Sequence, residues 1–286
     1  MRSYVPSFEL RSPATLAEAL DLFAREPGRW RPFAGGTDLM VLLEAGRLEH
    51  RDYVSLWHLP ELRFIEIDET SLAIGATTTY TDVLRHEAIG REFPMLGLAA
   101  AETGGVATQN RGTLAGNIAN GSPAADTPPA LLAYDAELEI VSARGVRRVP
   151  YEGFHTGYKQ MDLAPDELIR AIRLRRPHHP GRQLYRKVGT RRAQAISKVC
   201  FAGRLTLVDG TVEDARIALG SVAPTVVRAR LAEAVLRGRR LDSGTVADAR
   251  RALAGAIAPI DDARSTASYR SRVAGNLLEE FLTGAT

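Results

Sequence analysis

A stretch of small residues between Arg111 and Asp135 is the part of the sequence best suited to hold an anion. It reads RGTLAGNIANGSPAADTPPALLAYD and is nearly free of bulky side chains before Leu131. Small residues let a backbone approach another group closely, and successive exposed N–H groups can form a concavity that binds an anion. Asp126 is a candidate N-cap for a helix that begins at the following prolines. We interpret the stretch as a backbone cradle leading into a helix. A loop that packs under a neighbouring element is the alternative.

A second segment, RPFAGGTDLMVLLEAG at positions 31–46, predicts another cradle. A short strand ends at Ala34, Gly35-Gly36 makes a turn, and Thr37-Asp38 can cap the helix that follows. Unpaired N–H groups at such a helix start favour a phosphate. The segment is neither a Walker loop nor the GxGxxG fingerprint, and alone it is also compatible with a structural turn. Two cradles in one chain suggest a ligand with two linked phosphates.

No residues form a recognisable catalytic set or metal site. The histidines stand in no GxSxG or HExxH motif, and Cys200 lies in an apolar strand, where a packed thiol is favoured over a nucleophile. The segment Pro177-His178-His179-Pro180 has no nearby carboxylate or cysteine, so we interpret it as a linker rather than a zinc site. The reactivity of such a chain is expected to belong to a cofactor that the protein positions.

Composition excludes several other classes of protein. The formal charge of +3 is too small to indicate nucleic-acid binding, and no apolar run approaches the length of a membrane span. The first residues, MRSYVPSFEL, lack the apolar core of a signal peptide. A single cysteine allows no internal disulfide and cannot hold an iron–sulfur cluster by itself. We therefore expect a cytoplasmic location. The basic residues between Arg170 and Arg192 are interpreted mainly as a solvated strand face, with a docking or cofactor-facing surface as the alternative.

Two motifs, AGGTDL at 34–39 and TLAGNIANGSPAAD at 113–126, resemble the flavin-binding medium subunits of the molybdenum hydroxylases. That family includes carbon monoxide, xanthine and nicotinate dehydrogenases. The order and spacing of the motifs agree with the family pattern, and the similarity covers essentially the whole chain. One position departs, because the family usually has two glycines where this chain has Ala115-Gly116. We expect Ala115 at negative φ, with Gly116 taking any positive φ that the loop requires.

The resemblance implies noncovalent FAD, whose pyrophosphate would contact backbone N–H groups of residues 35–38 and 113–117. Neither cradle contains a histidine for covalent attachment. Asp126 would contact the flavin nucleotide, and Thr103 would lie near the adenine end. Ile169 and Lys187 would lie near the isoalloxazine ring. Three of these have simpler alternatives: Asp126 could only cap its helix, Ile169 could be core, and Lys187 could be solvated. The implied cofactor-binding residues are Pro32, Phe33, Ala34, Gly35, Gly36, Thr37, Asp38, Leu39, Thr103, Thr113, Leu114, Ala115, Gly116, Asn117, Asp126, Ile169 and Lys187.

The activity that the resemblance implies is that of an electron-transferring oxidoreductase subunit without catalytic residues of its own. A large partner subunit would hold the molybdenum cofactor and oxidise the substrate, and a small partner with [2Fe-2S] clusters would pass electrons to this FAD. The implied assembly is a dimer of heterotrimers, and the final acceptor would be NAD, a quinone or oxygen. The alternatives are a self-contained flavin oxidase and a partner module that keeps the fold without the flavin. The substrate pocket would lie on the large subunit.

The elements that must position these residues predict an α+β fold. Residues 1–57 alternate strand, helix, strand, helix and strand, which favours a small parallel sheet. Residues 58–177 predict strands at 61–65, 71–74, 138–142, 146–149 and 168–174, and helices at 80–84, 94–102 and 128–134. Residues 181–286 predict a three-stranded antiparallel sheet with a turn at Asp209-Gly210, followed by helices at 228–237, 243–256 and 266–283.

The same resemblance assigns these parts to known domain types. Residues 1–177 would form a two-part FAD-binding domain of the cresol-methylhydroxylase and molybdopterin dehydrogenase type, with subdomains of about 1–57 and 58–177. Residues 181–286 would form a C-terminal domain of the carbon monoxide dehydrogenase flavoprotein type.

Overall fold

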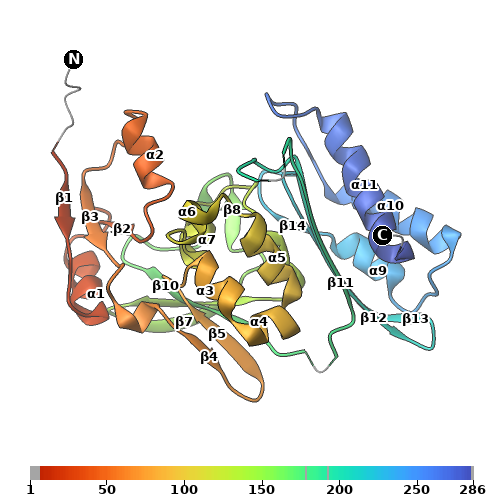
Figure 1. The fold of residues 1–286 in the computed structure, drawn as a ribbon, viewed down its shortest axis with the longest axis horizontal. Helices are drawn as coiled ribbons and strands as arrows, with labels where there is room; N and C mark the ends of the chain where they lie inside the picture. Colours follow the sequence, from red (N-terminus) through yellow and green to blue (C-terminus); the bar gives the residue numbers. More distant parts are fainter. Residues whose placement is uncertain (1–6, 178, 192, 285–286) are drawn as a thin grey trace.

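The computed structural model describes residues 7–177, 179–191 and 193–284, and it confirms the α+β class (Figure 1). Three larger sheets follow one another along the chain, with three, five and four strands. A separate hairpin consists of β8 (His155–Gly157) and β9 (Gln160–Met161). None of the helices in these ranges is long and apolar enough to cross a membrane.

The N-terminal sheet is parallel, as the alternation of elements predicted. Its strands are β1 (Glu9–Arg11), β3 (Asp52–Ser55) and β2 (Arg31–Phe33), in that spatial order. The connections contain α1 (Leu16–Arg25) and α2 (Leu39–Glu44). Since parallel strands end at the same edge of a sheet, the first cradle and Leu56 leave this sheet side by side. A hydrogen bond of 2.8 Å from Leu56 N–H to Phe33 O fixes that edge.

The middle sheet is antiparallel, and helices cover one of its faces (Figure 1). Its spatial order is β4 (Ile65–Ile67), β5 (Ser71–Gly75), β10 (Leu168–Arg175), β6 (Glu137–Ser142) and β7 (Gly145–Pro150). The helices are α3 (Tyr80–Arg85), α4 (Glu87–Glu92), α5 (Pro94–Glu102), α6 (Val106–Gln109), α7 (Leu114–Ala119) and α8 (Thr127–Ala133).

The strand predicted at 61–65 is wrong. Residues Pro60–Leu62 form a 3-10 turn, η1, and β4 begins only at Ile65. Pro60 has no N–H to offer a sheet, while its fixed φ suits the first position of a helical turn. Leu62 N–H then bonds Leu59 O at 3.1 Å, which closes the turn.

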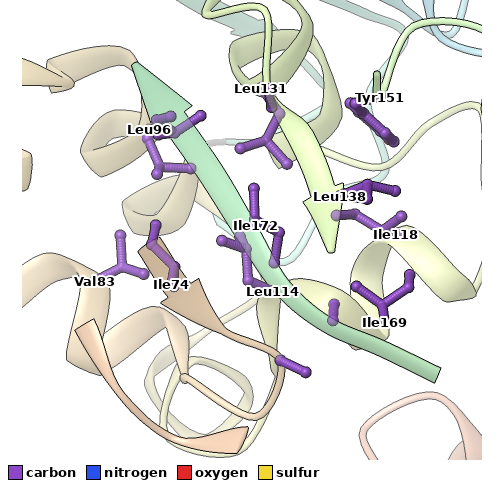
Figure 2. Close-up of a cluster of buried hydrophobic side chains, with 14 of the residues drawn as sticks. Ile74, Val83, Leu96, Leu114, Ile118, Leu131, Leu138, Tyr151, Ile169 and Ile172 are labelled. Carbon is purple, nitrogen blue, oxygen red and sulfur yellow. The ribbon is translucent and has the colours of Figure 1, made fainter. Parts of the chain in front are cut away.

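A row of buried side chains across the middle sheet holds α7 in place (Figure 2). Ile74, Ile172 and Leu138 lie opposite one another on three adjacent strands. They pack with Leu114 and Ile118 of α7, and all five side chains are 0% exposed. Burial of five such side chains contributes roughly 1.5–3 kcal/mol each relative to exposure. The packing therefore fixes the second cradle close to β10.

The C-terminal sheet has four antiparallel strands rather than the predicted three. Its order is β11 (Arg182–Val188), β12 (Val199–Val208), β13 (Thr211–Gly220) and β14 (Val227–Arg228). A two-residue strand is too short to show a period-2 pattern, which is why the sequence did not reveal β14. The predicted turn is confirmed, because Asp209 and Gly210 have φ of 50° and 78°. The helices α9 (Arg230–Leu236), α10 (Ser243–Ala256) and α11 (Ala267–Thr283) follow.

The basic residues after Arg170 join elements instead of forming a merely solvated face. Arg170 and Arg173 both bond the buried Glu139. Arg182 donates to the carbonyl oxygens of Phe281 and Leu282 at the end of α11, Arg176 pairs with Glu92, and Arg186 pairs with Glu280. The predicted linker at 177–180 cannot be described in full, because His178 lies outside the described residues.

Candidate functional site

A cavity of about 300 Å³ lies between the two predicted cradles. The first cradle forms one wall, α7 forms another, and the start of β10 closes the base. The predicted residues that line it are Pro32, Ala34, Gly35, Gly36, Thr37, Asp38, Leu39, Thr113, Ala115, Gly116, Asn117 and Ile169. The tertiary structure thus brings both motifs and Ile169 to one site.

The first cradle presents backbone donors to this cavity. Gly36 turns the chain with a φ of 77°, a backbone conformation that residues with a side chain rarely adopt. Asp38 precedes α2, but neither it nor Thr37 gives the helix a side-chain cap, which corrects the predicted cap. Within the described part of the chain, no oxygen accepts a hydrogen bond from the N–H groups of residues 35–38. These donors are therefore available to an anion.

The second cradle is the capped start of α7. Thr113 Oγ1 accepts a hydrogen bond of 3.2 Å from Gly116 N–H. Leu114 N–H donates to Thr78 O at 3.1 Å, and Ala115 N–H donates to Ala76 O at 3.3 Å. Most backbone donors predicted to hold the pyrophosphate here are therefore already bonded within the chain. The polar groups left to face the cavity belong mainly to side chains.

One of those side chains is Asn117, whose orientation is fixed from behind. Thr127 Oγ1 donates to Asn117 Oδ1 at 2.6 Å. The oxygen is thus engaged, and the amide nitrogen remains able to donate a hydrogen bond.

Ala115 lies in α7 and has no positive φ, so that prediction is confirmed. Gly116 has no positive φ either, and the loop needs no left-handed residue at this point. The departure from a glycine pair is accommodated because both residues adopt helical geometry.

Asp126 and Lys187 form a buried ion pair, and neither residue lines the cavity in the described chain. Lys187 Nζ lies 2.7 Å from Asp126 Oδ2 and donates to Glu102 O at 2.8 Å. Ser197 Oγ donates to Asp126 Oδ1 at 2.7 Å. Burial raises the pKa of Asp126, against the opposing effects of Lys187 and Ser197. The Asp126 side chain makes no cap bond to α8, so it is not simply a helix cap. The Lys187 side chain is only 4% exposed, so it is not simply solvated.

The other three predicted residues lie away from the cavity wall. Thr103 Oγ1 donates to Ala99 O at 2.7 Å, within the last turn of α5. Leu114 belongs to the core shown in Figure 2. Phe33 lies beneath the first cradle, where its ring contacts Tyr53 edge-on at 6.2 Å between centroids.

Sequence reasoning missed several residues that line the cavity. The most informative are Thr77, in the turn between β5 and α3, and Tyr80, the first residue of α3. The run ATTTY at 76–80 is a signal that could have found them, because hydroxyl residues directly after a buried strand often face a site. The other missed lining residues are Leu56, Ala76, Ala119, Asn120, Leu163 and Leu168.

The residues present fit a cofactor with an anionic, hydrogen-bonding middle section. Residues 35–38, whose N–H groups are unbonded within the described chain, line the cavity, and so does Thr77, whose buried Oγ1 has no partner in the described structure. Buried polar groups are normally hydrogen-bonded, so such a group indicates a missing ligand or water. Fold and site together define a protein that holds a phosphate-containing cofactor between two loops.

The family models identify which class of cofactor protein this is. Residues 6–177 match the FAD binding domain in molybdopterin dehydrogenase, and residues 184–285 match the CO dehydrogenase flavoprotein C-terminal domain. The chain belongs to this family of molybdopterin dehydrogenase FAD-binding proteins. The xanthine dehydrogenase FAD-binding subunit of Escherichia coli O157:H7 is 34% identical, over 95% of this chain and 94% of that protein.

Solved structures agree with this assignment over the whole fold. Carbon monoxide dehydrogenase from Hydrogenophaga pseudoflava, in a form lacking the Mo-pyranopterin moiety, contains a chain that matches with a TM-score of 0.94 and 29% identity. The match covers 99% of this chain and 98% of that one. Quinoline 2-oxidoreductase from Pseudomonas putida 86 contains a chain that matches with a TM-score of 0.90 and 27% identity. This match covers 99% of this chain and 98% of that one. The family that the sequence resemblance implied is confirmed.

Proposed function

We propose that this chain is the FAD-binding, electron-transferring subunit of a molybdenum hydroxylase complex. The observation that carries the proposal is the cavity between the two cradles, with free backbone donors at residues 35–38, in a chain that matches such subunits along its length. When bound, FAD supplies the capacity to accept and release one or two electrons. The protein supplies a fixed, partly enclosed position for it.

The first cradle is the proposed pyrophosphate site, because its N–H groups have no other acceptor in the described chain. Thr113 and Asn117 on α7 would add side-chain contacts from the opposite wall. Ile169 would give an apolar contact at the base of the cavity. Asp126, Lys187 and Thr103 remain proposed contributors, although none of the three lines the cavity in the described chain. Phe33 and Leu114 would support the cradles from below.

The partners follow from what this chain lacks. Its one cysteine, Cys200, is buried and cannot hold an iron–sulfur cluster alone. We propose a small partner with [2Fe-2S] clusters, a large partner with the molybdenum cofactor, and a dimer of these heterotrimers. Carbon monoxide dehydrogenase relatives described as medium chains support an assembly of several subunits. The same scarcity of cysteine supports a cytoplasmic location.

The first experiment is to purify the chain and record its visible spectrum before and after acid precipitation. A flavin spectrum, with the yellow colour released into the supernatant, supports noncovalent FAD. Colour retained in the protein pellet would contradict the noncovalent assignment. A chain that neither contains nor takes up flavin would favour a non-catalytic module.

The second experiment separates an electron-transfer subunit from a self-contained oxidase. The isolated chain, and then the reconstituted three-subunit complex, are mixed rapidly with a candidate substrate without oxygen. Bleaching of the flavin band only in the complex supports the proposal. Bleaching in the isolated chain would support the oxidase.

A further inference from the structure

Tyr80 is a buried residue that lines the cavity, and its hydroxyl makes no hydrogen bond within the described chain. It is the first residue of α3, lines the cavity and is only 3% exposed. Several contacts fix it in place. Thr79 and Asp82 form a reciprocal capping box around it, and Tyr80 N–H donates to Gly112 O at 3.2 Å. No described residue makes a hydrogen bond with its hydroxyl.

The ring of Tyr80 fits closely against the second cradle. A Cβ added to Gly112 would lie 2.7 Å from Tyr80 Cε2, so the glycine leaves room for this ring. Gly112 directly precedes Thr113, the cap of α7. The position of the Tyr80 hydroxyl is therefore set by the same contacts that set the second cradle.

The electrostatic surroundings keep this hydroxyl protonated. Burial raises the pKa of Tyr80, and the negative charge of Asp126 raises it further. The Asp126 carboxylate already accepts from Lys187 and Ser197. Tyr80 thus remains a neutral hydroxyl that can donate a hydrogen bond to a group in the cavity.

We propose that the Tyr80 hydroxyl donates a hydrogen bond to an acceptor atom of the bound FAD. This inference rests on the proposed function and adds a binding residue from α3 that belongs to neither motif. It makes α3 a third wall of the site, beside the first cradle and α7.

The test is Tyr80→Phe, which keeps the ring packed on Gly112 and removes only the donor. FAD affinity is measured by titration of the apoprotein, and we expect it to fall about fivefold to tenfold, the value of one ordinary hydrogen bond. Tyr151→Phe is the matched control, because Tyr151 is also buried, its hydroxyl has no partner in the described chain, and it does not line this cavity. That variant should bind FAD like the wild type.

FMN and AMP, the two halves of FAD, distinguish a specific bond from general damage. In Tyr80→Phe, a bond to the cofactor weakens FAD and one half only. Equal weakening of both halves would assign Tyr80 a purely structural role and overturn the inference. Unchanged FAD affinity, as expected if the hydroxyl only meets water, would also overturn it while leaving the proposed function intact. If the wild-type chain itself does not bind FAD, the proposed function fails first.

Discussion

Gly35 lies directly against the carbonyl oxygen of Arg111, so the two cradles touch through their backbones. A Cβ on Gly35 would lie 1.8 Å from Arg111 O and 2.7 Å from Arg111 C. The guanidinium of Arg111 lies 3.7 Å from the ring centroid of Trp57, which follows the N-terminal sheet. This contact between distant parts of the chain sets the spacing between the walls of the site.

Gly35→Ala should therefore separate the cradles and weaken FAD binding. The backbone must move to accommodate the methyl group, which costs of order 1–3 kcal/mol, so we expect at least about a fivefold loss of affinity. Gly97→Ala is the control, because Gly97 lies in α5 with nothing within 4 Å of an added Cβ. Titration of both apoproteins with FAD measures the effect. Equal affinities for the two variants would show that the contact does not set the site.

Gly116→Val should also release FAD while the fold survives. A Cβ at this position would lie 2.6 Å from Thr113 Oγ1, so the larger side chain displaces the cap of α7 at the cavity wall. Loss of such a cap costs about 1 kcal/mol of stability, which leaves circular dichroism close to that of the wild type. Ala115→Gly should be tolerated, since Ala115 is helical and has no positive φ. Normal flavin content in the purified Gly116→Val protein would refute the close-approach argument.

Lys187→Met should destabilise the apoprotein, because it leaves the Asp126 carboxylate buried without its cation. Removing one partner of a buried pair costs about 3–5 kcal/mol. The double variant with Asp126→Asn should recover much of this loss, and urea unfolding of the four proteins measures the coupling. An unchanged stability of Lys187→Met would instead favour a role for Lys187 toward the flavin alone.

The pH dependence of Lys187→Met follows from the pKa of Asp126, which burial already raises. Such an acid keeps its proton in the folded chain at pH values where the unfolded chain has lost it. The penalty is therefore absent below the unfolded pKa, grows as the pH rises from there to the raised folded pKa, and stays constant above it. The variant should lie closer to the wild type at acidic pH than at neutral pH.

Glu92→Gln tests an ion pair that joins α4 to the end of β10. Arg176 makes two bonds to Glu92, of 2.7 Å and 3.0 Å, and together with Arg91 it lowers the pKa of Glu92 from 4.5 to about 2. A carboxylate with a depressed pKa stabilises the fold above about pH 4.5, and this stabilisation is lost as the pH falls toward 2. We expect the free energy of unfolding, measured with urea, to lie roughly 1–3 kcal/mol below that of the wild type at neutral pH and to converge with it on acidification. Exposed Glu69→Gln serves as the control, and a pH-independent difference would contradict this account.

Local patterns explain why much of the site could be predicted from the sequence. The first cradle combines a strand end, two glycines and a helix start within a few residues, and each of these signals acts through its own neighbours. Thr113 likewise caps α7 through a bond to Gly116 N–H, three residues away. The prediction of a strand at 61–65 was wrong because Pro60 favours a helical turn, which the apolar pattern did not show.

The sequence by itself therefore determined the two cradles, the α+β class and the family, because these depend on residue types at short, fixed spacing. Only the tertiary structure decided which donors remain free, since the N–H groups of Leu114 and Ala115 find acceptors in the distant turn at Ala76 and Thr78. It also paired Asp126 with Lys187 and turned Tyr80 toward the cavity. Hydrogen bonds and ion pairs form between whichever groups the packed core brings within about 3 Å, and no local pattern records that choice.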